Sequence, residues 1–261
     1  MFLSFNVSRF KIPALIVCTL IIVVVCTLTL FPTVGHKLLA VVASNRIVPI
    51  YAVHTEEKVV AISFDAAWGS DNTATLLDIL DEYDIKTTFF LCGRWIEEYP
   101  EKTKLIADRG HEIGNHSLTH PHMNTLSSAE RSKEIMETHK LIKETTEQDA
   151  WLFRCPFGEY NNAVIESCHS NNYEAIQWDV DSLDWREYAD ANYIYNRVTK
   201  RVKEGSIVLF HNNGAHTTEA LPRILDYFQE KGFKVVKISD ILYKENYVVD
   251  PASGLQKQKK S

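Results

Sequence analysis

Three histidines lie close together in the polar segment 112–122, which includes a short strand-like run. His116 and His120 are four residues apart, so one turn of helix would place both rings on one face, with Cβ atoms about 5–6 Å apart. Two neutral imidazole nitrogens at that spacing can bind one divalent metal ion at the ~2.0–2.1 Å typical of zinc–imidazole bonds. The alternative is a polar surface face that binds nothing. The spacing by itself leaves both interpretations open.

Polar and aromatic side chains also follow four other strand-like runs. The first run ends in the segment 63–69, which is Ser-Phe-Asp-Ala-Ala-Trp-Gly, and later runs end in segments that carry Arg154, Asp184 and His211. The carboxyl ends of parallel strands meet at one edge of a sheet, and a stable fold needs no acid, base or imidazole there. We therefore expect one hydrolytic site, assembled from segments that are far apart in the sequence.

The elements that must position these residues alternate between strand-like and helix-like patterns. Strands are predicted at 59–64, 87–91, 111–114, 151–154, 174–180, 206–210 and 233–238. Helices are predicted at 71–83, 94–109, 127–147, 162–170, 190–204 and 218–231. This alternation predicts an α/β fold with a parallel sheet, either an open doubly wound sheet or a closed barrel. About seven units in one series favour a distorted (β/α) barrel, with the site at the carboxyl ends of the strands.

The composition is that of an ordinary globular chain. Of the 261 residues, 45% are hydrophobic and 24% are charged, which supplies ample material for a core. The formal net charge of −6 argues against nucleic acid as a partner.

Residues 12–31 form a charge-free apolar run, long enough to cross about 30 Å of hydrocarbon. Arg9 and Lys11 precede this run, so the positive-inside rule places the N-terminus in the cytoplasm and the rest of the chain outside. A cleaved signal peptide is the alternative, because small residues at 40–43 offer a cleavage site. The run is longer than the usual signal core, so we expect an uncleaved single-pass anchor in the cell membrane, with the lipid bilayer as a partner.

The predicted organisation follows from this anchor. It consists of a cytoplasmic N-terminus at 1–11, a transmembrane anchor at 12–31, a connector at 32–57, an extracytoplasmic domain at 58–245 and a flexible tail at 246–261.

In order and spacing, the segments at the strand ends resemble the motifs of the polysaccharide deacetylase family, the NodB homology domain of carbohydrate esterase family 4. The resemblance covers about residues 59–242 and includes counterparts of all five family motifs. Within the family, the chain is most similar to sporulation-type deacetylases of Gram-positive spore formers. Three features carry this similarity: the Phe-Asp-x-x-Trp-Gly form of the first motif, the Leu-Phe-His-Asn-Asn ending and the anchor. The resemblance implies a NodB-like barrel that hydrolyses the N-acetyl group of amino sugars in peptidoglycan or a related N-acetylglucosamine-containing cell-wall glycan.

The resemblance also implies catalytic roles. Asp65 matches the general base, and Arg154 matches the residue that holds this base and favours its ionised form. His211 matches the general acid that protonates the leaving amine, and Asp184 matches the carboxylate that tunes this acid.

The resemblance implies a metal and a substrate pocket as well. His116 and His120 match the two histidine ligands of a divalent metal, zinc first and cobalt or manganese as alternatives. A bound metal lowers the pKa of its water toward ~7, so a carboxylate suffices as the base. The other implied residues bind substrate: Phe157 through its backbone N–H, and Trp185 and Leu209 around the acetyl group.

Trp68 follows the first strand and has two interpretations. Its ring could stack on a sugar, as aromatic faces do, or pack under the rim of the barrel.

One position departs from the family pattern. The family has two consecutive aspartates in its first motif, the base and then a metal ligand, and here the second is Ala66. Two imidazoles remain, fewer than the three protein ligands typical of catalytic zinc sites. The metal is therefore expected to be weakened or absent, with Asp65, Asp71 and His122 as candidate substitute ligands.

Two functions follow from these residues. The first is an exported, membrane-anchored N-deacetylase, supported by the acid–base residues. The second is a glycan-binding protein that has kept the cleft and lost the metal, supported by Ala66.

Overall fold

The computed structural model describes residues 46–259. Ile47–Ser261 is one compact unit, and the description below concerns its described part. Within residues 46–259, no helix is both long enough and apolar enough to cross a membrane. The predicted anchor at 12–31 lies outside the described residues, so it stays a prediction.

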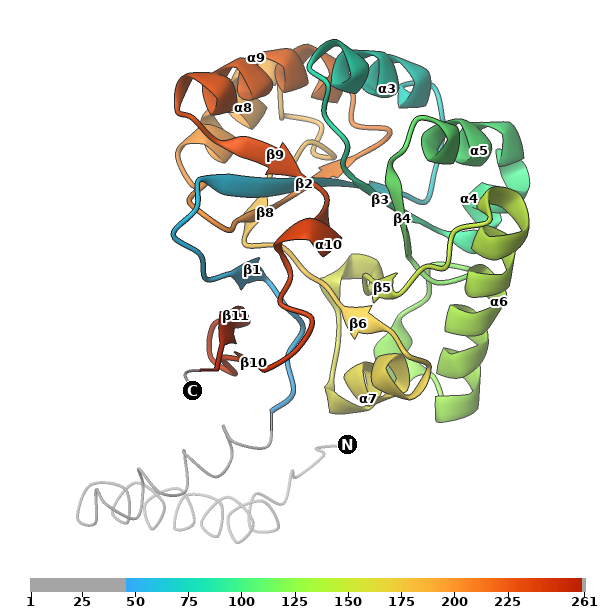
Figure 1. The fold of residues 1–261 in the computed structure, drawn as a ribbon. Coiled ribbons are helices and arrows are strands. Elements are labelled where there is room, and N and C mark those ends of the chain that lie inside the picture. The colour runs from blue at the N-terminus through green and yellow to red at the C-terminus, as the bar shows by residue number, and fades with distance from the viewer. Residues whose placement is uncertain (1–45, 260–261) are drawn as a thin grey trace, which may run out of the picture. The chain divides into compact units, whose positions relative to one another are not determined.

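A parallel sheet curls into a half-barrel at the centre of the unit (Figure 1). Its strands run in the order β6 (Glu174–Ala175), β5 (Leu152–Phe153), β4 (Glu112–Asn115), β3 (Thr88–Leu91), β2 (Val59–Ala66), β8 (Ile207–His211) and β7 (Val180–Asp181), and β9 (Lys234–Val236) pairs with the start of β2. All its ladders are parallel, which confirms the predicted α/β class. Within residues 46–259, β6 and β7 share no ladder, so the strands form an incomplete ring.

The predicted strand at 174–180 is wrong, because this segment forms two short strands at opposite edges of the sheet. The residues between β6 and β7 cross from one edge to the other. Gln177 donates its backbone N–H to the Ile50 carbonyl at 2.7 Å, and the Asp179 carboxylate accepts from the Ile207 N–H at 2.9 Å. These bonds replace the missing ladder and bring the two edges of the sheet together.

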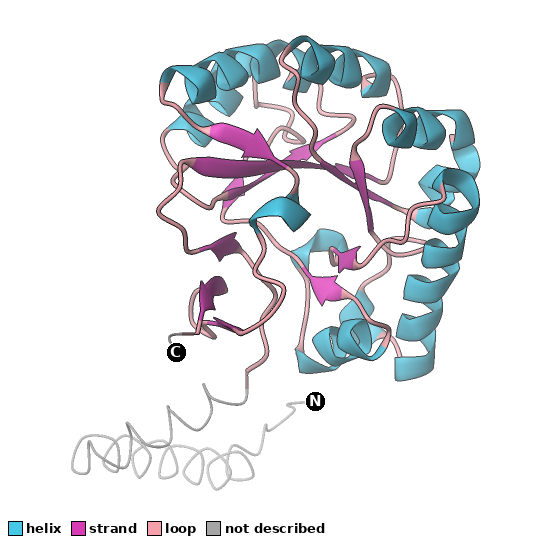
Figure 2. Ribbon diagram, viewed as in Figure 1, coloured by secondary structure: helices cyan, strands magenta, loops and turns pink. Residues whose placement is uncertain are grey.

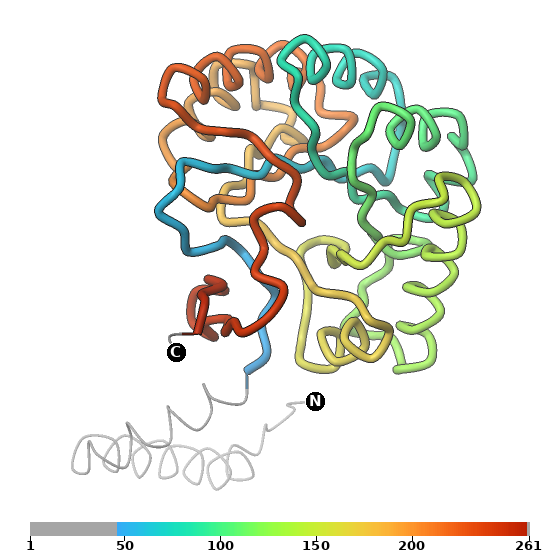
Figure 3. The backbone as a smooth tube through the Cα atoms, in the orientation of Figure 1, coloured from blue at the N-terminus to red at the C-terminus, as the bar shows by residue number. Residues whose placement is uncertain are grey.

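The start and the end of the unit form a second, small sheet. β11 (Leu255–Gln258) lies between β1 (Ala52–Val53) and β10 (Tyr247–Val249), and Figure 3 shows the blue start and the red end of the described residues close together at this place. The prediction of a flexible tail at 246–261 is therefore wrong for its described part. The predicted connector at 32–57 is also wrong from Ile47 onward. Gln256 of β11 is fully buried, so the tail packs as part of the fold.

Helices cover the outer face of the curled sheet (Figure 2). They are α3 (Thr73–Glu82), α4 (Gly93–Glu98), α5 (Pro100–Asp108), α6 (Ser128–Thr146), α7 (Asn162–Ser170), α8 (Ala191–Thr199) and α9 (Thr217–Glu230). The short helix α10 (Ile238–Ile241) instead packs on the inner side, where Ile238 joins the cluster that contains Ala61 and Phe90. The 3₁₀ turns are η1 (Met123–Thr125) and η2 (Pro156–Gly158). The predicted helix at 94–109 is split because Pro100 has no N–H to continue α4 and instead occupies the first turn of α5. α6 begins at the predicted place, where Ser127 and Glu130 form a capping box.

Strand alternation decides which side chains of β2 face the helices. Val60, Ile62 and Phe64 are fully buried in the core between the sheet and the helices. Ser63 and Asp65 point to the opposite face, because successive side chains of a strand alternate. This alternation directs Asp65 into the half-barrel.

Substitution of two glycines measures how closely the segment 50–53 packs against the sheet. Gly205 and Gly232 have nearly equal φ angles, +74° and +75°. A Cβ on Gly205 would lie 1.8 Å from the Val53 carbonyl oxygen, whereas a Cβ on Gly232 would meet nothing closer than 4.0 Å. Gly232→Ala should cost about 1 kcal/mol of unfolding free energy from backbone strain. Gly205→Ala should cost a further ~1–3 kcal/mol, because the clash displaces β1.

Urea unfolding of the full chain measures both costs. Equal losses in the two variants would show that β1 does not press on Gly205.

Candidate active site

The carboxyl ends of the strands surround a cavity of about 470 Å³. Most of the residues predicted for the site line it directly: Asp65, Trp68, His116, His120, Phe157, Trp185, Leu209 and His211. The other two, Arg154 and Asp184, are buried behind Asp65 and His211. The fold thus brings together the predicted residues from segments up to about 150 positions apart.

A buried ion pair orients Asp65. The fully buried Arg154 donates to Asp65 Oδ1 at 2.7 Å, to the Ser63 hydroxyl at 2.8 Å and to the Gln177 carbonyl at 3.2 Å. Its guanidinium carbon lies 4.0 Å from the centre of the Phe90 ring. Burial alone would raise the pKa of Asp65, but the charge and hydrogen bond of Arg154, together with the neighbouring His116 and His211, outweigh burial and lower the pKa. Asp65 is therefore ionised at neutral pH.

His116 and His120 follow β4 in a loop, so the predicted helical turn is wrong. Ser117 and His120 have positive φ angles of 67° and 56°, which a right-handed helix excludes. The Glu134 carboxylate of α6 holds this loop by accepting two of its backbone N–H groups, at 2.8 and 2.9 Å. The two imidazole rings are nevertheless adjacent, with centroids 4.9 Å apart.

The hydrogen bonds of His116 define its tautomer. Its Nδ1 lies 2.8 Å from the Arg154 carbonyl oxygen, which can only accept, so Nδ1 carries the proton. Nε2 is left as an acceptor 3.6 Å from Asp65 Oδ2. Burial lowers the pKa of His116, and it lowers the pKa of His120 to about 3. Both rings are therefore neutral at pH 7, the form that binds metals. His120 Nδ1 is buried with no hydrogen-bond partner within residues 46–259.

A third ligand is missing from the described part of the chain. Residues 46–259 contain no group of three or more His, Cys, Asp or Glu side chains that could hold a metal ion. Ala66 is fully buried in the hydrophobic core, whereas its neighbours Asp65 and Ala67 line the cavity. Asp71 and His122 are exposed and do not line it. The residues present therefore do not fit the family's three-ligand metal set, and Asp65 is the only proposed substitute that faces the histidines.

A second oriented pair holds His211. Asp184 Oδ1 lies 2.7 Å from His211 Nδ1, and Asp184 Oδ2 accepts from the His211 backbone N–H at 2.8 Å and from the Thr217 hydroxyl at 2.7 Å. Burial alone would lower the pKa of His211, but the hydrogen bond and negative charge of Asp184 raise it above its usual value. His211 and Asp65 are direct neighbours across the β2–β8 ladder. A proton acceptor and a proton donor therefore lie side by side.

Exposed aromatic rings form the rim of the cavity. Trp68, Phe157 and Trp185 are 60%, 54% and 49% exposed, whereas Leu209 is buried at the wall. Phe157 has a positive φ of 59°, and its ring stacks on His122 with centroids 4.5 Å apart. Large apolar side chains gathered at a cavity are typical of binding sites. The role of the Phe157 backbone N–H stays a prediction.

Five residues that line the cavity received no role from the sequence: Ala67, Gly158, Trp178, Asp181 and Asn213. Asp181 and Trp178 both line it, and pairing of Asp181 with Leu209 across the β7–β8 ladder brings this carboxylate to the wall. Burial raises the pKa of Asp181. Trp178 lies within the predicted strand 174–180 and Asp181 directly after it. Because this segment divides between two sheet edges, the prediction of one continuous strand did not indicate which side chains face the cavity.

Comparison with known proteins agrees with this geometry. The family model described as polysaccharide deacetylase matches residues 52–176. A peptidoglycan-N-acetylglucosamine deacetylase of Bacillus cereus is 32% identical over 197 residues, which are 74% of this chain and 92% of that protein. The uncharacterized protein YlxY of Bacillus subtilis is 30% identical over 194 residues, and the chain covers 74% of its own length but only 60% of that protein.

A solved structure is also similar. The Bacillus anthracis protein BA3943, described as a CE4 family pseudoenzyme, has 36% identity and a TM-score of 0.72, over 76% of this chain and 69% of that one. A BA3943 mutant described as having restored enzymatic activity gives the same TM-score at 37% identity, over 76% of this chain and 72% of that one. On the fold, the strand-end residues and these relatives together, the chain belongs to the polysaccharide deacetylase family.

Proposed function

We propose that the cavity binds an N-acetylated amino-sugar polymer of the bacterial cell wall, peptidoglycan first, and hydrolyses its acetamide groups. The observation that carries this proposal is the pair of oriented acid–base groups, Asp65 with Arg154 and His211 with Asp184, beside one cavity. The family and the B. cereus relative support the choice of substrate.

The chemistry follows from the protonation states. Asp65 is ionised and can take a proton from a water that attacks the acetamide carbonyl carbon. His211, protonated through its contact with Asp184, can give a proton to the departing amine nitrogen, so that acetate and a free amino sugar leave. Because residues 46–259 supply two imidazoles where three protein ligands are usual, we expect turnover to be slow.

The exposed rim supports a polymeric substrate. Trp68 and Trp185 are exposed at the mouth of the cavity, and aromatic rings pack against the apolar face of a pyranose. Leu209 and Trp185 are the expected contacts of the acetyl methyl group.

A second candidate function is glycan binding without hydrolysis. Ala66 favours it, because an alanine cannot bind a metal, and so does the resemblance to BA3943. Under this candidate the rim and the cavity bind the same polymer, but no acetate is released.

We also propose that the chain is exported and anchored in the cell membrane, with a role in sporulation. The apolar run at 12–31 and its preceding basic residues support the anchor. Protease added to intact protoplasts should degrade the folded unit and leave the N-terminus protected.

Removal of the base tests the first candidate. Asp65→Asn should reduce acetate release from peptidoglycan and from N-acetylglucosamine oligomers by at least ~10²-fold, because no other carboxylate among residues 46–259 forms an ion pair with Arg154. Asp71→Asn, at an exposed carboxylate outside the cavity, should keep the wild-type rate. Release is measured with zinc, cobalt or manganese added after chelation. Full activity of Asp65→Asn would refute the assignment of the base.

Restoring a carboxylate tests the metal site. Ala66→Asp should bind zinc more than about a hundredfold more tightly than the wild type, because it adds a third ligand. Isothermal titration calorimetry measures this affinity, and Ala66→Asn is the matched control of nearly equal size. Equal zinc affinity in both variants would mean that position 66 stays turned toward the core. If the wild type releases no detectable acetate but Ala66→Asp does, the second candidate function, glycan binding without hydrolysis, is favoured.

The pKa of His211 tests the acid. Asp184→Asn should lower this pKa, measured by NMR titration of the imidazole, because the negative charge at Nδ1 is lost. A raised folded-state pKa stabilises the fold below pH ~6.5, and this contribution disappears as pH rises through the folded value. The stability difference between wild type and variant should therefore shrink at alkaline pH.

Asp181→Asn is the control for this titration. Asp181 lines the same cavity, yet it makes no hydrogen bond to His211 in the described residues, so its loss should lower the pKa of His211 less. An unchanged His211 titration in Asp184→Asn contradicts the role of Asp184.

A further inference from the structure

A second cavity, of about 300 Å³, lies at the other end of the strands. Trp151 directly precedes β5 and Glu174 is the first residue of β6, whereas the catalytic candidates follow their strands. The C-terminal segment forms the remaining wall with Leu242, Tyr243, Lys244, Tyr247 and Gln256. This cavity is therefore separate from the site described above.

Hydrogen bonds hold its C-terminal wall in place. The Gln256 side chain accepts the Tyr243 backbone N–H at 2.9 Å and donates to the Tyr243 carbonyl at 2.8 Å. Tyr247 donates its hydroxyl to Glu174 Oε2 at 2.6 Å. Burial and the Glu174 carboxylate raise the pKa of Tyr247, so this phenol stays protonated at neutral pH. The cavity is thus built before any ligand arrives, which lowers the entropic cost of binding.

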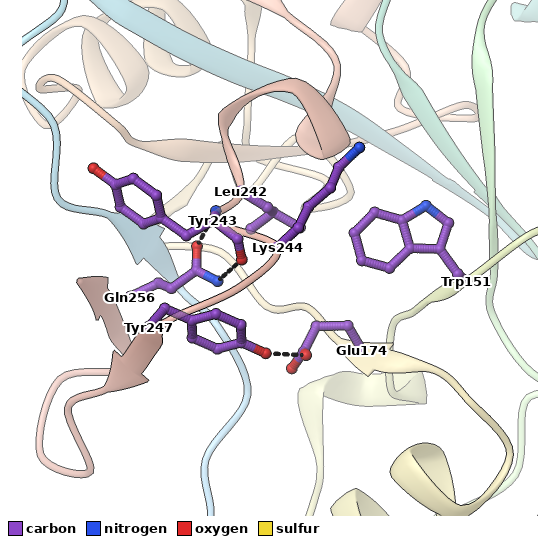
Figure 4. A pocket seen from close by; sticks show the side chains of 7 residues that line it. All are labelled: Trp151, Glu174, Leu242, Tyr243, Lys244, Tyr247 and Gln256. Carbon is purple, nitrogen blue, oxygen red and sulfur yellow. Dashed lines mark hydrogen bonds between the residues drawn. The ribbon is translucent and has the colours of Figure 1, made fainter. Parts of the chain in front are cut away.

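Three different groups converge on this cavity (Figure 4). The Trp151 indole stands on one side, the Lys244 side chain extends from the other, and the Glu174 carboxylate lies below them. Within residues 46–259, neither the indole N–H nor the Lys244 ammonium has a hydrogen-bond or ion-pair partner. Glu174 Oε1 is 3.8 Å from His169 Nε2, and a carboxylate keeps further acceptor capacity beyond one hydroxyl.

This combination suits one class of small ligand. A pyranose ring has an apolar face that packs on an indole and a rim of hydroxyl and amide groups that can both donate and accept. Glu174 offers acceptors, and Lys244 and the indole N–H offer donors. The cavity volume is at the lower end of the range for small-molecule sites, enough for about one sugar unit. A hydrocarbon chain would use neither the remaining acceptor capacity of Glu174 nor the donors of Lys244 and the indole, so it suits the cavity less well.

We propose that this cavity is a second glycan-binding site, which takes one neutral N-acetylated pyranose unit at the end of the fold opposite the candidate active site. Binding there requires no hydrolysis, so the inference goes beyond the proposed function. A protein that holds its polymer at two places stays near it for longer, because the second contact becomes intramolecular.

Fluorine NMR of the full-length chain tests this site. The chain has five tryptophans, so labelling with 5-fluorotryptophan gives few resonances, and Trp151→Phe and Trp185→Phe assign the two that matter. Titration with the trisaccharide of N-acetylglucosamine should shift the Trp151 resonance in the low-millimolar range. Lys244→Ala should weaken that response about threefold to tenfold. Lys244 is exposed, so its loss should not disturb folding.

Controls separate this site from the cleft. Lys234→Ala, an exposed lysine on β9, and Trp185→Ala, on the rim of the cleft, should both leave the Trp151 response unchanged. A Trp185 resonance that shifts while Trp151 stays still would overturn the second site and leave the proposed function intact. A Trp151 resonance that responds to a free stem peptide of peptidoglycan but not to the trisaccharide would also overturn it.

Discussion

The buried contact between Arg154 and Asp65 is the constraint on which the candidate site depends. Arg154 is fully buried, bonded to β2 and to the residues after β6, and it stacks on Phe90 of β3. A buried guanidinium is tolerated only when its charge is paired, and a buried carboxylate stays ionised only beside such a charge. This pair therefore fixes the register of the strands around it and keeps the pKa of Asp65 low.

The same pair positions the histidines. The Arg154 carbonyl fixes the tautomer of His116, whose free nitrogen then faces Asp65. His211 is the neighbour of Asp65 across the next ladder, and Asp184 raises the pKa of that ring. The arrangement lacks a third metal ligand, because the residue after Asp65 is Ala66, whose side chain packs in the core. The residues expected to act as base and acid are present, and the described residues supply two of the three expected metal ligands.

The C-terminal segment forms part of a second cavity. β11 pairs with β1 and with β10, and these C-terminal strands lie beyond the residues matched by the family model. They form part of the wall of this cavity at the opposite end of the strands. The polymer expected at the cleft and the sugar-sized cavity below the sheet are chemically consistent with each other. One fold can thus hold one glycan at two ends.

The sequence by itself determined the parallel α/β class, the strand ends that carry the site, and the loss at Ala66, because periodicity and residue type are local properties. Only the tertiary structure decided that the segment 174–180 divides between two sheet edges and that the tail from 246 pairs with β1. It also decided that the histidine loop is not helical, since Glu134 of α6 binds its backbone. Asp181 and Trp178 escaped prediction for the same reason: strand pairing between distant segments selects which side chains face the cavity, and no local pattern records that pairing.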